Sequence, residues 1–280
     1  MSELQTDQIP RVRSKNRIEH RQAKSILSRA SGFIDQFDFT LNPYSGCTFA
    51  CTYCYAASFA STDELKAQWG HWVHIKDNAL QLLINYRRKP LIDKTIYMSS
   101  VTDPYQPVER ELELTRSLVA ELAEYHDVKL VVQTRSPLVT RDLDLLKRFK
   151  RVRVNMTITT DDEAIRRAFE PTCPSVTQRL NAIAEVAAAG IETCITLTPL
   201  LPVRDPQAFG ERLRETGVQH FVVQEFHTGK QRFAASTGDN AWALSAQLAW
   251  TPARYREVVS VLHSYLPGLR EGREGFVPSW

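Results

Sequence analysis

The sequence has few of the features typical of membrane, secreted or low-complexity proteins. None of its apolar runs approaches the ~20 residues needed to span a bilayer. Its first residues are polar and charged, without the apolar segment of a secretory signal. A net charge of +3 over 280 residues is too small to identify a partner, and 43% hydrophobic residues are ordinary for a globular protein. We therefore expect a globular enzyme or binding protein that does not insert into membranes.

Cysteine is also scarce, but its placement is informative. Of five cysteines, Cys47, Cys51 and Cys54 fall within eight residues, with the spacing C-x3-C-x2-C. A loop this short and polar cannot bury three thiols as inert hydrophobic groups, so they pair as disulfides or surround a metal. A disulfide would leave one thiol over, and nothing else in the chain indicates an oxidising compartment. We therefore favour a metal site and a reducing, cytoplasmic location.

The number of cysteines narrows the choice of metal. A structural zinc site needs four ligands, usually in two pairs, whereas Cys173 and Cys194 are distant and unpaired in the sequence. Iron–sulfur clusters are normally held by four thiolates, so three would leave one iron open to a non-protein ligand. An open position is typical of a catalytic centre. The alternative is a non-catalytic iron–sulfur or zinc protein that acts as a redox sensor or nucleic-acid-binding module.

The residues around the cysteines resemble a known family. The motif Cys-x3-Cys-x-Tyr-Cys, with Tyr53 before the last cysteine, resembles the signature of radical S-adenosylmethionine (SAM) enzymes. The wider run at residues 42–56 is similar to the branch that contains spore photoproduct lyase. The resemblance implies a 4Fe–4S cluster on Cys47, Cys51 and Cys54, with SAM on its open iron. It implies reductive cleavage of SAM to a 5′-deoxyadenosyl radical that abstracts a substrate hydrogen, with an electron donor such as flavodoxin or ferredoxin.

Strand-like and helix-like segments alternate along most of the chain. We expect strands at residues 37–41, 94–99, 128–134, 152–159, 192–197 and 221–224, with a further short strand at 72–76. We expect helices at residues 78–86, 113–125, 140–149, 175–189, 207–216 and 252–265. Six strands that alternate with helices predict an α/β fold with a parallel sheet and right-handed crossovers.

The resemblance implies that this sheet is a partial (β/α)6 TIM-type barrel. We expect residues 1–30 to be a basic N-terminal extension, 31–226 the barrel, and 227–280 a C-terminal segment that closes it. Residues 11–29 contain seven basic side chains and one acid, Glu19. Such an arm can bind phosphates, which makes nucleic acid a candidate substrate, but the interpretation that we favour for the arm itself is a solvated, partly disordered leader.

The loop after the second barrel strand, residues 99–109, contains a second set of candidates. In α/β barrels, functional residues lie on loops at the carboxyl ends of strands. The run Thr-Asp-Pro-Tyr-Gln-Pro-x-Glu is similar to that of the branch, and it is also rich in turn residues. From this likeness we take Ser100 and Asp103 as cofactor contacts and Tyr105 and Glu109 as catalytic residues.

The same loop departs from spore photoproduct lyase, which uses a cysteine hydrogen-atom donor near this position. Here the candidates are Ser99, Ser100 and Thr102, and an O–H bond is too strong to donate a hydrogen atom readily to a carbon radical. Repair of thymine dimers of the spore type is therefore not expected. Cys173, in a turn after the fourth strand, is the remaining candidate for a thiol hydrogen donor.

Polar side chains at the ends of the later strands complete the predicted cofactor site. The family binds SAM with groups at these positions, and for several of them the alternative is a local helix cap. By resemblance, we expect the SAM contacts to be Tyr53, Ser100, Asp103, Thr134, Arg135, Ser136, Thr157, Thr159, Arg179 and Pro199.

Overall fold

The computed structural model describes residues 16–226, 239–278 and 280. Its main sheet has the strand order β11-β10-β9-β8-β7-β6-β3-β2. The six central strands are mutually parallel neighbours. They are β3 (Phe39–Leu41), β6 (Ile92–Met98), β7 (Asp127–Thr134), β8 (Arg151–Thr157), β9 (Glu192–Leu197) and β10 (His220–Val223). The predicted six-stranded parallel sheet is thus confirmed.

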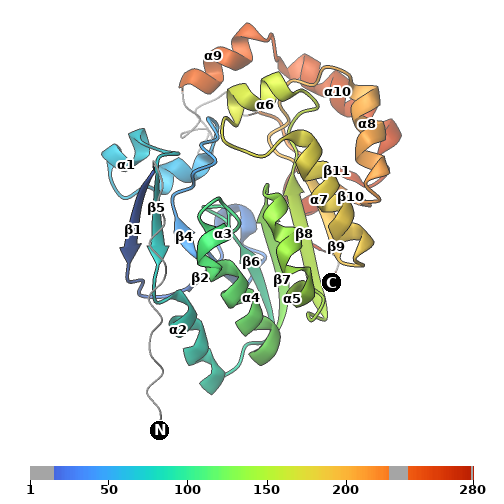
Figure 1. The fold of residues 1–280 in the computed structure, drawn as a ribbon. Helices are drawn as coiled ribbons and strands as arrows, with labels where there is room; N and C mark the ends of the chain where they lie inside the picture. Colours follow the sequence, from blue (N-terminus) through green and yellow to red (C-terminus); the bar gives the residue numbers. More distant parts are fainter. Residues whose placement is uncertain (1–15, 227–238, 279) are drawn as a thin grey trace.

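Helices connect these strands along one face of the sheet (Figure 1). After β6 come α3 (Glu109–Leu112) and α4 (Leu114–Tyr125), and after β7 a 3-10 helix (Pro137–Asp142) and α5 (Leu143–Leu146). After β8 come α6 (Glu163–Phe169) and α7 (Val176–Ala188), and after β9 comes α8 (Pro206–Glu215). The predicted helix at 140–149 is therefore the end of a 3-10 helix followed by a single α-helical turn, and residues 147–149 lie beyond it.

Local sequence explains where these elements begin. β7 contains buried Leu130, Val131 and Val132, whose side chains point alternately to the two faces, as expected for a parallel strand covered on both faces. Helix α7 starts at a capping box, in which the Ser175 hydroxyl accepts from the backbone of Gln178 and the Gln178 side chain accepts from the Ser175 N–H. The main hydrophobic core lies between the sheet and these helices.

Among the described residues the main sheet does not close on itself, as expected for a partial barrel. At one edge β2 (Leu27–Arg29) pairs antiparallel with β3, and at the other β11 (Leu269–Glu271) pairs parallel with β10. Within the described ranges, the outer edges of β2 and β11 pair with no further strand. The C-terminal segment contains α9 (Asp239–Gln247) and α10 (Pro252–Tyr265) besides β11. In the part of it that the structure describes, the segment extends the sheet rather than closing it.

A second, smaller sheet includes part of the N-terminal segment that the sequence suggested to be a partly disordered leader. Its order is β1 (Arg17–Arg21), β5 (Trp72–Lys76), β4 (Tyr44–Ser45), and β1 runs parallel to β5. Residues 17–21 and 27–29 are thus strands rather than a disordered leader. Nη2 of Arg21 lies 2.7 Å from Oε2 of Glu19, which offsets part of the basic charge. Residues 1–15, the rest of the predicted extension, lie outside the described residues.

The described residues contain no helix of the length and hydropathy required to cross a membrane. Two smaller helices complete the fold near the cysteines, namely a 3-10 helix (Tyr55–Phe59) and α1 (Asp63–Ala67).

Candidate active site

The three clustered cysteines lie on a loop at the carboxyl edge of the parallel sheet. The loop leaves β3 and passes through Gly46, whose φ is +78°. A Cβ at this position would lie 2.5 Å from the backbone oxygen of Trp72, so both the backbone angle and the space require glycine. The loop thereby reaches the sheet edge where α/β enzymes place their active sites.

Side chains from the neighbouring loop, residues 99–109, hold the backbone of the cysteine loop. Asn42 at the start of the cysteine loop accepts hydrogen bonds from Ser100 N (2.9 Å) and Val101 N (3.2 Å). Gln106, which is fully buried, accepts from Thr48 N at 3.1 Å. Asn42 and Gln106 were not predicted as site residues, because their partners are backbone groups about 60 residues away in the sequence.

Burial strongly affects the thiols themselves. Cys47 and Cys51 are buried and Cys54 is half-buried. Burial raises the pKa of Cys54 to about 12 and that of Cys47 well above its usual value. The negative charge of Cys51 raises both pKa values further. A bound cation would relieve this repulsion.

The donor set fits an iron–sulfur cluster better than a single metal ion. In the part of the chain that the structure describes, no three Cys, His, Asp or Glu side chains are arranged to hold one metal ion. A 4Fe–4S cluster differs because it takes its thiolates on separate irons, so the sulfurs need not converge on one point. Three soft, mostly buried thiols within eight residues have the chemistry that such a cluster requires.

Arg135 links Cys51 to the rest of the site. Its Nη1 lies 2.9 Å from Cys51 Sγ, and Cys173 Sγ lies 3.7 Å from the same sulfur. The hydrogen bond from Cys173 and the positive charge of Arg135 together lower the pKa of Cys51, although burial opposes them. Cys51 is therefore the most readily ionised of the three clustered thiols.

Glu170 is the centre of a buried polar network. Its carboxylate accepts hydrogen bonds from Arg135 Nη1 (3.0 Å), Thr159 Oγ1 (2.9 Å), Tyr53 and Arg179. Burial alone would raise its pKa, but the charges of Arg179 and Arg135 hold the pKa at about 2. We call these five residues the Glu170 network. The structure brings together four predicted contacts around a carboxylate that was not predicted.

Asp103 joins the 99–109 loop to the end of β7. Its carboxylate accepts from Thr134 Oγ1 (2.7 Å), Arg135 N (2.8 Å) and Tyr105 N (2.9 Å). Ser136 caps the 3-10 helix that follows, because its hydroxyl accepts from the backbone at residue 138. Asp103, Thr134 and Ser136 thus fix the conformation of the chain at the end of β7. For Ser136 the structure shows the helix cap that the sequence offered as the alternative to a SAM contact.

The predicted catalytic roles of Tyr105 and Glu109 conflict with where these side chains lie. Both residues are fully buried. The Glu109 carboxylate already accepts from Tyr44, from Thr115 N at 2.8 Å and from Arg141 Nη2 at 2.7 Å. These contacts indicate that Glu109 stabilises the 99–109 loop from within the protein interior and does not face a substrate.

The remaining predicted residues follow β8 and β9. Thr157 Oγ1 accepts from Gln133 Nε2 at 2.8 Å and lies 3.1 Å from Thr196 Oγ1. Pro199 belongs to the turn after β9. A hydrogen bond from Leu201 N to Thr159 O, at 2.9 Å, fixes this turn. These groups lie at the carboxyl edge of the sheet, as the sequence predicted.

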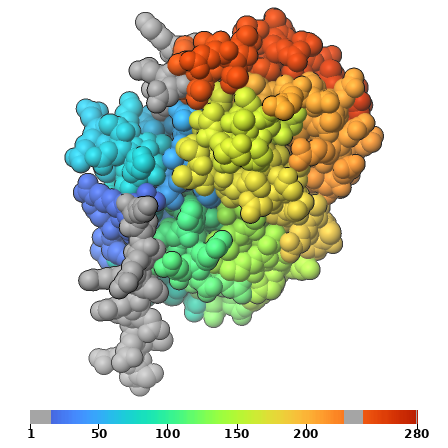
Figure 2. Space-filling model, turned by 45° about the horizontal axis from the view of Figure 1, so that its top comes forward, coloured from blue at the N-terminus to red at the C-terminus, as the bar shows by residue number. Residues whose placement is uncertain are grey.

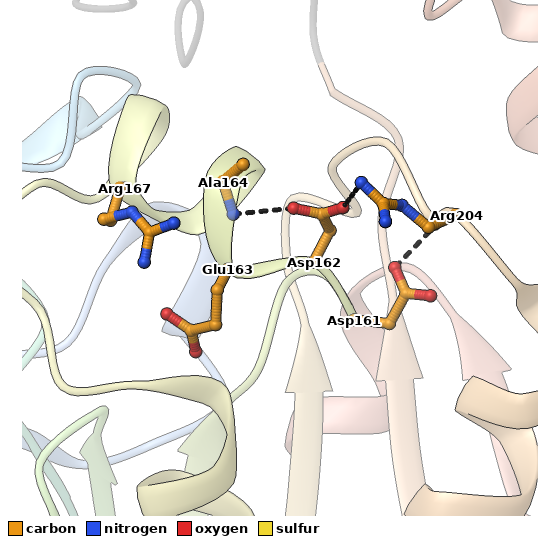
Figure 3. Close-up of a pocket in the computed structure, with 6 residues that line it drawn as sticks. All are labelled: Asp161, Asp162, Glu163, Ala164, Arg167 and Arg204. Carbon is orange, nitrogen blue, oxygen red and sulfur yellow. Dashed lines mark hydrogen bonds and ion pairs between the residues drawn. The ribbon is translucent and has the colours of Figure 1, made fainter.

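A charged recess also lies beyond the carboxyl ends of the strands (Figure 3). It is lined by Asp161, Asp162, Glu163, Ala164, Arg167 and Arg204. Asp162 pairs with Arg204 at 2.7 Å and also accepts from Ala164 N, at 2.6 Å. Because these charges largely satisfy one another, we assign the recess no part in the cofactor site.

Comparisons with known proteins identify the family. Residues 41–215 match the family model of the Radical SAM superfamily. The chain belongs to this superfamily. Its members are enzymes that use a 4Fe–4S cluster and SAM and need an electron donor, so the predicted cofactors are confirmed. The match begins at the end of β3 and includes the cysteine loop and the Glu170 network.

Individual relatives agree with this result. An uncharacterised protein of Methanocaldococcus jannaschii is 34% identical over 164 residues, which cover 59% of this chain and 61% of the relative. A "Radical SAM Nalpha-GlyT isomerase" of Pseudomonas phage M6 is 24% identical over 67% of this chain and 39% of its own length. The matched regions thus span less than two thirds of these two relatives.

Among solved structures, a spore photoproduct lyase variant with bound AdoMet and dinucleoside spore photoproduct has a similar fold. Its TM-score is 0.62 at 13% sequence identity, with 91% of this chain and 81% of that chain covered. This likeness supports the partial barrel, and the predicted fold class is confirmed.

Proposed function

We propose that this protein reductively cleaves SAM and uses the resulting radical to abstract a hydrogen atom from a substrate. Cys47, Cys51 and Cys54 would hold the cluster, and the open iron would take SAM. When bound, the two cofactors supply cleavage of a sulfur–carbon bond to give the 5′-deoxyadenosyl radical. The observation that carries the proposal is the cysteine loop at the sheet edge, with Arg135 in contact with Cys51.

The protein's own side chains would bind and orient the cofactors and shield them from water. The guanidinium of Arg135 places positive charge beside a ligand sulfur, which favours the thiolate and an added electron. The Tyr53 hydroxyl lies 3.0 Å from Arg135 and donates to Glu170, so its ring is fixed next to the cysteines. Burial of the network limits access of water to the site.

We divide the predicted SAM contacts into two groups. We propose Tyr53, Arg135 and Thr159 as contacts, because all three bind Oε1 of Glu170 and Arg135 also contacts Cys51. Arg179 is fully buried and donates to Thr157 O, Pro174 O and Glu170. We therefore propose Arg179 as a positioning residue that acts through Glu170.

We propose a nucleic acid as the substrate class. The resemblance to the branch of spore photoproduct lyase supports this choice, as does the nucleoside ligand in the similar solved structure. Ser99 and Ser100 stand where a thiol donor would be required for repair of the spore type, so we propose a different modification of the nucleic acid. Five free cysteines fit a reducing, cytoplasmic location.

Two measurements test the proposal. Anaerobically reconstituted protein should contain about four irons and four sulfides per chain, and SAM should alter the electron paramagnetic resonance (EPR) spectrum of its reduced cluster. The Cys54→Ala variant should lose both properties, whereas Cys194→Ala, a change within β9, should retain them. Stoichiometric zinc in place of iron would support the sensor or binding-module alternative.

The substrate class needs its own assay. Fluorescence anisotropy with labelled DNA and RNA, repeated over a series of salt concentrations, should show binding that weakens as salt increases. A flat response for both nucleic acids would exclude the proposed substrate class without affecting the proposed SAM chemistry.

A further inference from the structure

Two thiols from distant parts of the chain meet beside the proposed cluster. Cys51 Sγ and Cys173 Sγ are 3.7 Å apart, although 122 residues separate them in the sequence. Both side chains are buried and both thiols are free. A disulfide has an S–S length of about 2.05 Å, so the sulfurs need to approach by less than ~2 Å to form one.

Hydrogen bonds on both sides of the pair fix the two backbones relative to each other. Next to Cys51, Thr52 N donates to Phe169 O at 2.9 Å. Next to Cys173, the Thr172 hydroxyl donates to Thr48 O at 2.5 Å. In Figure 2 the blue surface of the chain around residue 50 borders the yellow-green surface of the chain around α6. The sulfurs are therefore held near each other by the fold.

Hydrogen bonds to Glu170 and Arg166 fix the backbone of Cys173. Its N–H donates to Glu170 O at 3.1 Å, and its carbonyl accepts from Arg166 Nη1 at 3.0 Å. The same Arg166 nitrogen donates to Glu170 O at 2.9 Å. The turn that carries Cys173 is thus fixed independently of the cysteine loop.

We propose that Cys51 and Cys173 form a reversible disulfide in the cluster-free protein, which removes Cys51 from the ligand set until the bond is reduced. The proposal rests on the proposed function only in naming Cys51 as a cluster ligand. Hydrogen peroxide is a sufficient oxidant. Two S–H bonds and the O–O bond break, one S–S bond and two O–H bonds form, and two water molecules leave.

The consequence is control of cluster loading. With the bond formed, only Cys47 and Cys54 of the three motif thiols remain free. Reduction by a thiol such as dithiothreitol would return Cys51 and permit loading. The bond would also protect Cys51 from further oxidation to the irreversible sulfinic and sulfonic acids.

The test uses the full-length, metal-free chain treated with a small excess of hydrogen peroxide and then alkylated. We expect two of the five thiols to be lost and a tryptic peptide pair joined through Cys51 and Cys173. Cys194→Ser should form the same link. Free, alkylated Cys51 and Cys173 after peroxide, or a bond from Cys51 to Cys47 or Cys54, would overturn the proposal.

A second readout is iron uptake after peroxide. Wild-type protein should take up no cluster until dithiothreitol is added and should then recover fully. Cys173→Ser should recover incompletely, because its Cys51 has no partner and oxidises further; recovery equal to wild type would contradict the proposal. If the linked peptide forms but reduced protein never binds iron, the proposed function fails while the disulfide stands.

Discussion

Replacing Glu170 by glutamine tests the central network most sharply. The substitution keeps the shape of the side chain but removes the negative charge between Arg135 and Arg179. Breaking a buried ion pair by neutralising one partner costs about 3–5 kcal/mol, because the remaining charge is left buried and uncompensated. The pKa gives a similar value: holding a carboxyl at about 2 instead of 4.5 corresponds to about 3 kcal/mol.

The pH dependence follows from the direction of this shift. The pKa of Glu170 is lower in the folded protein, so its contribution is fully present above pH 4.5 and is lost as the pH falls towards 2. The difference in free energy of unfolding between wild type and Glu170→Gln should therefore be about 3 kcal/mol or more at pH 7. It should shrink progressively below pH 4.5.

Urea unfolding of the metal-free, reduced protein measures both effects. Glu124→Gln is the matched control, because Glu124 pairs with Arg148 at the surface, with both side chains at least 44% exposed. Surface pairs contribute about 0–1 kcal/mol, so this variant should be nearly neutral. A Glu170→Gln loss below 1 kcal/mol at pH 7, or a difference from wild type that does not change with pH, would refute the reasoning.

Three further substitutions probe the cysteine loop. Gly46→Ala should destabilise by well over 1 kcal/mol in urea unfolding, whereas Gly190→Ala, also at positive φ but in open space, should cost only about 1 kcal/mol. Gln106→Leu removes the acceptor for Thr48 N and should speed iron release to a chelator without preventing folding. Arg135→Gln should lower the reduction potential of the cluster in an EPR redox titration, since a positive charge next to a ligand sulfur is lost; an unchanged potential would contradict the role given to this residue.

The sequence was most informative where the determinants are local. The spacing of Cys47, Cys51 and Cys54 and the alternation of apolar strands with helices are contained in short segments. The motif and the six parallel strands were therefore predictable. The same is true of Ser136, whose capping role needs only its neighbours.

Features that depend on distant partners were not predictable in this way. Glu170 lies in a turn like many others, and only the fold brings it to Tyr53 and Arg135. Glu109 resembled a site residue by its motif, but its burial against Arg141 is decided by tertiary packing. The charged segment at residues 17–21 forms a strand because it pairs with β5, more than 50 residues later.

The central claim is that the three-cysteine loop supports reductive cleavage of SAM. The most direct measurement is the amount of 5′-deoxyadenosine formed when anaerobically reconstituted protein, reduced with dithionite, is given SAM, in parallel with Cys51→Ala. We predict that the nucleoside forms with the wild-type motif and not with the variant. Equal amounts from both proteins, or none from wild type that carries a full cluster and is supplied with candidate nucleic acids, would contradict the account.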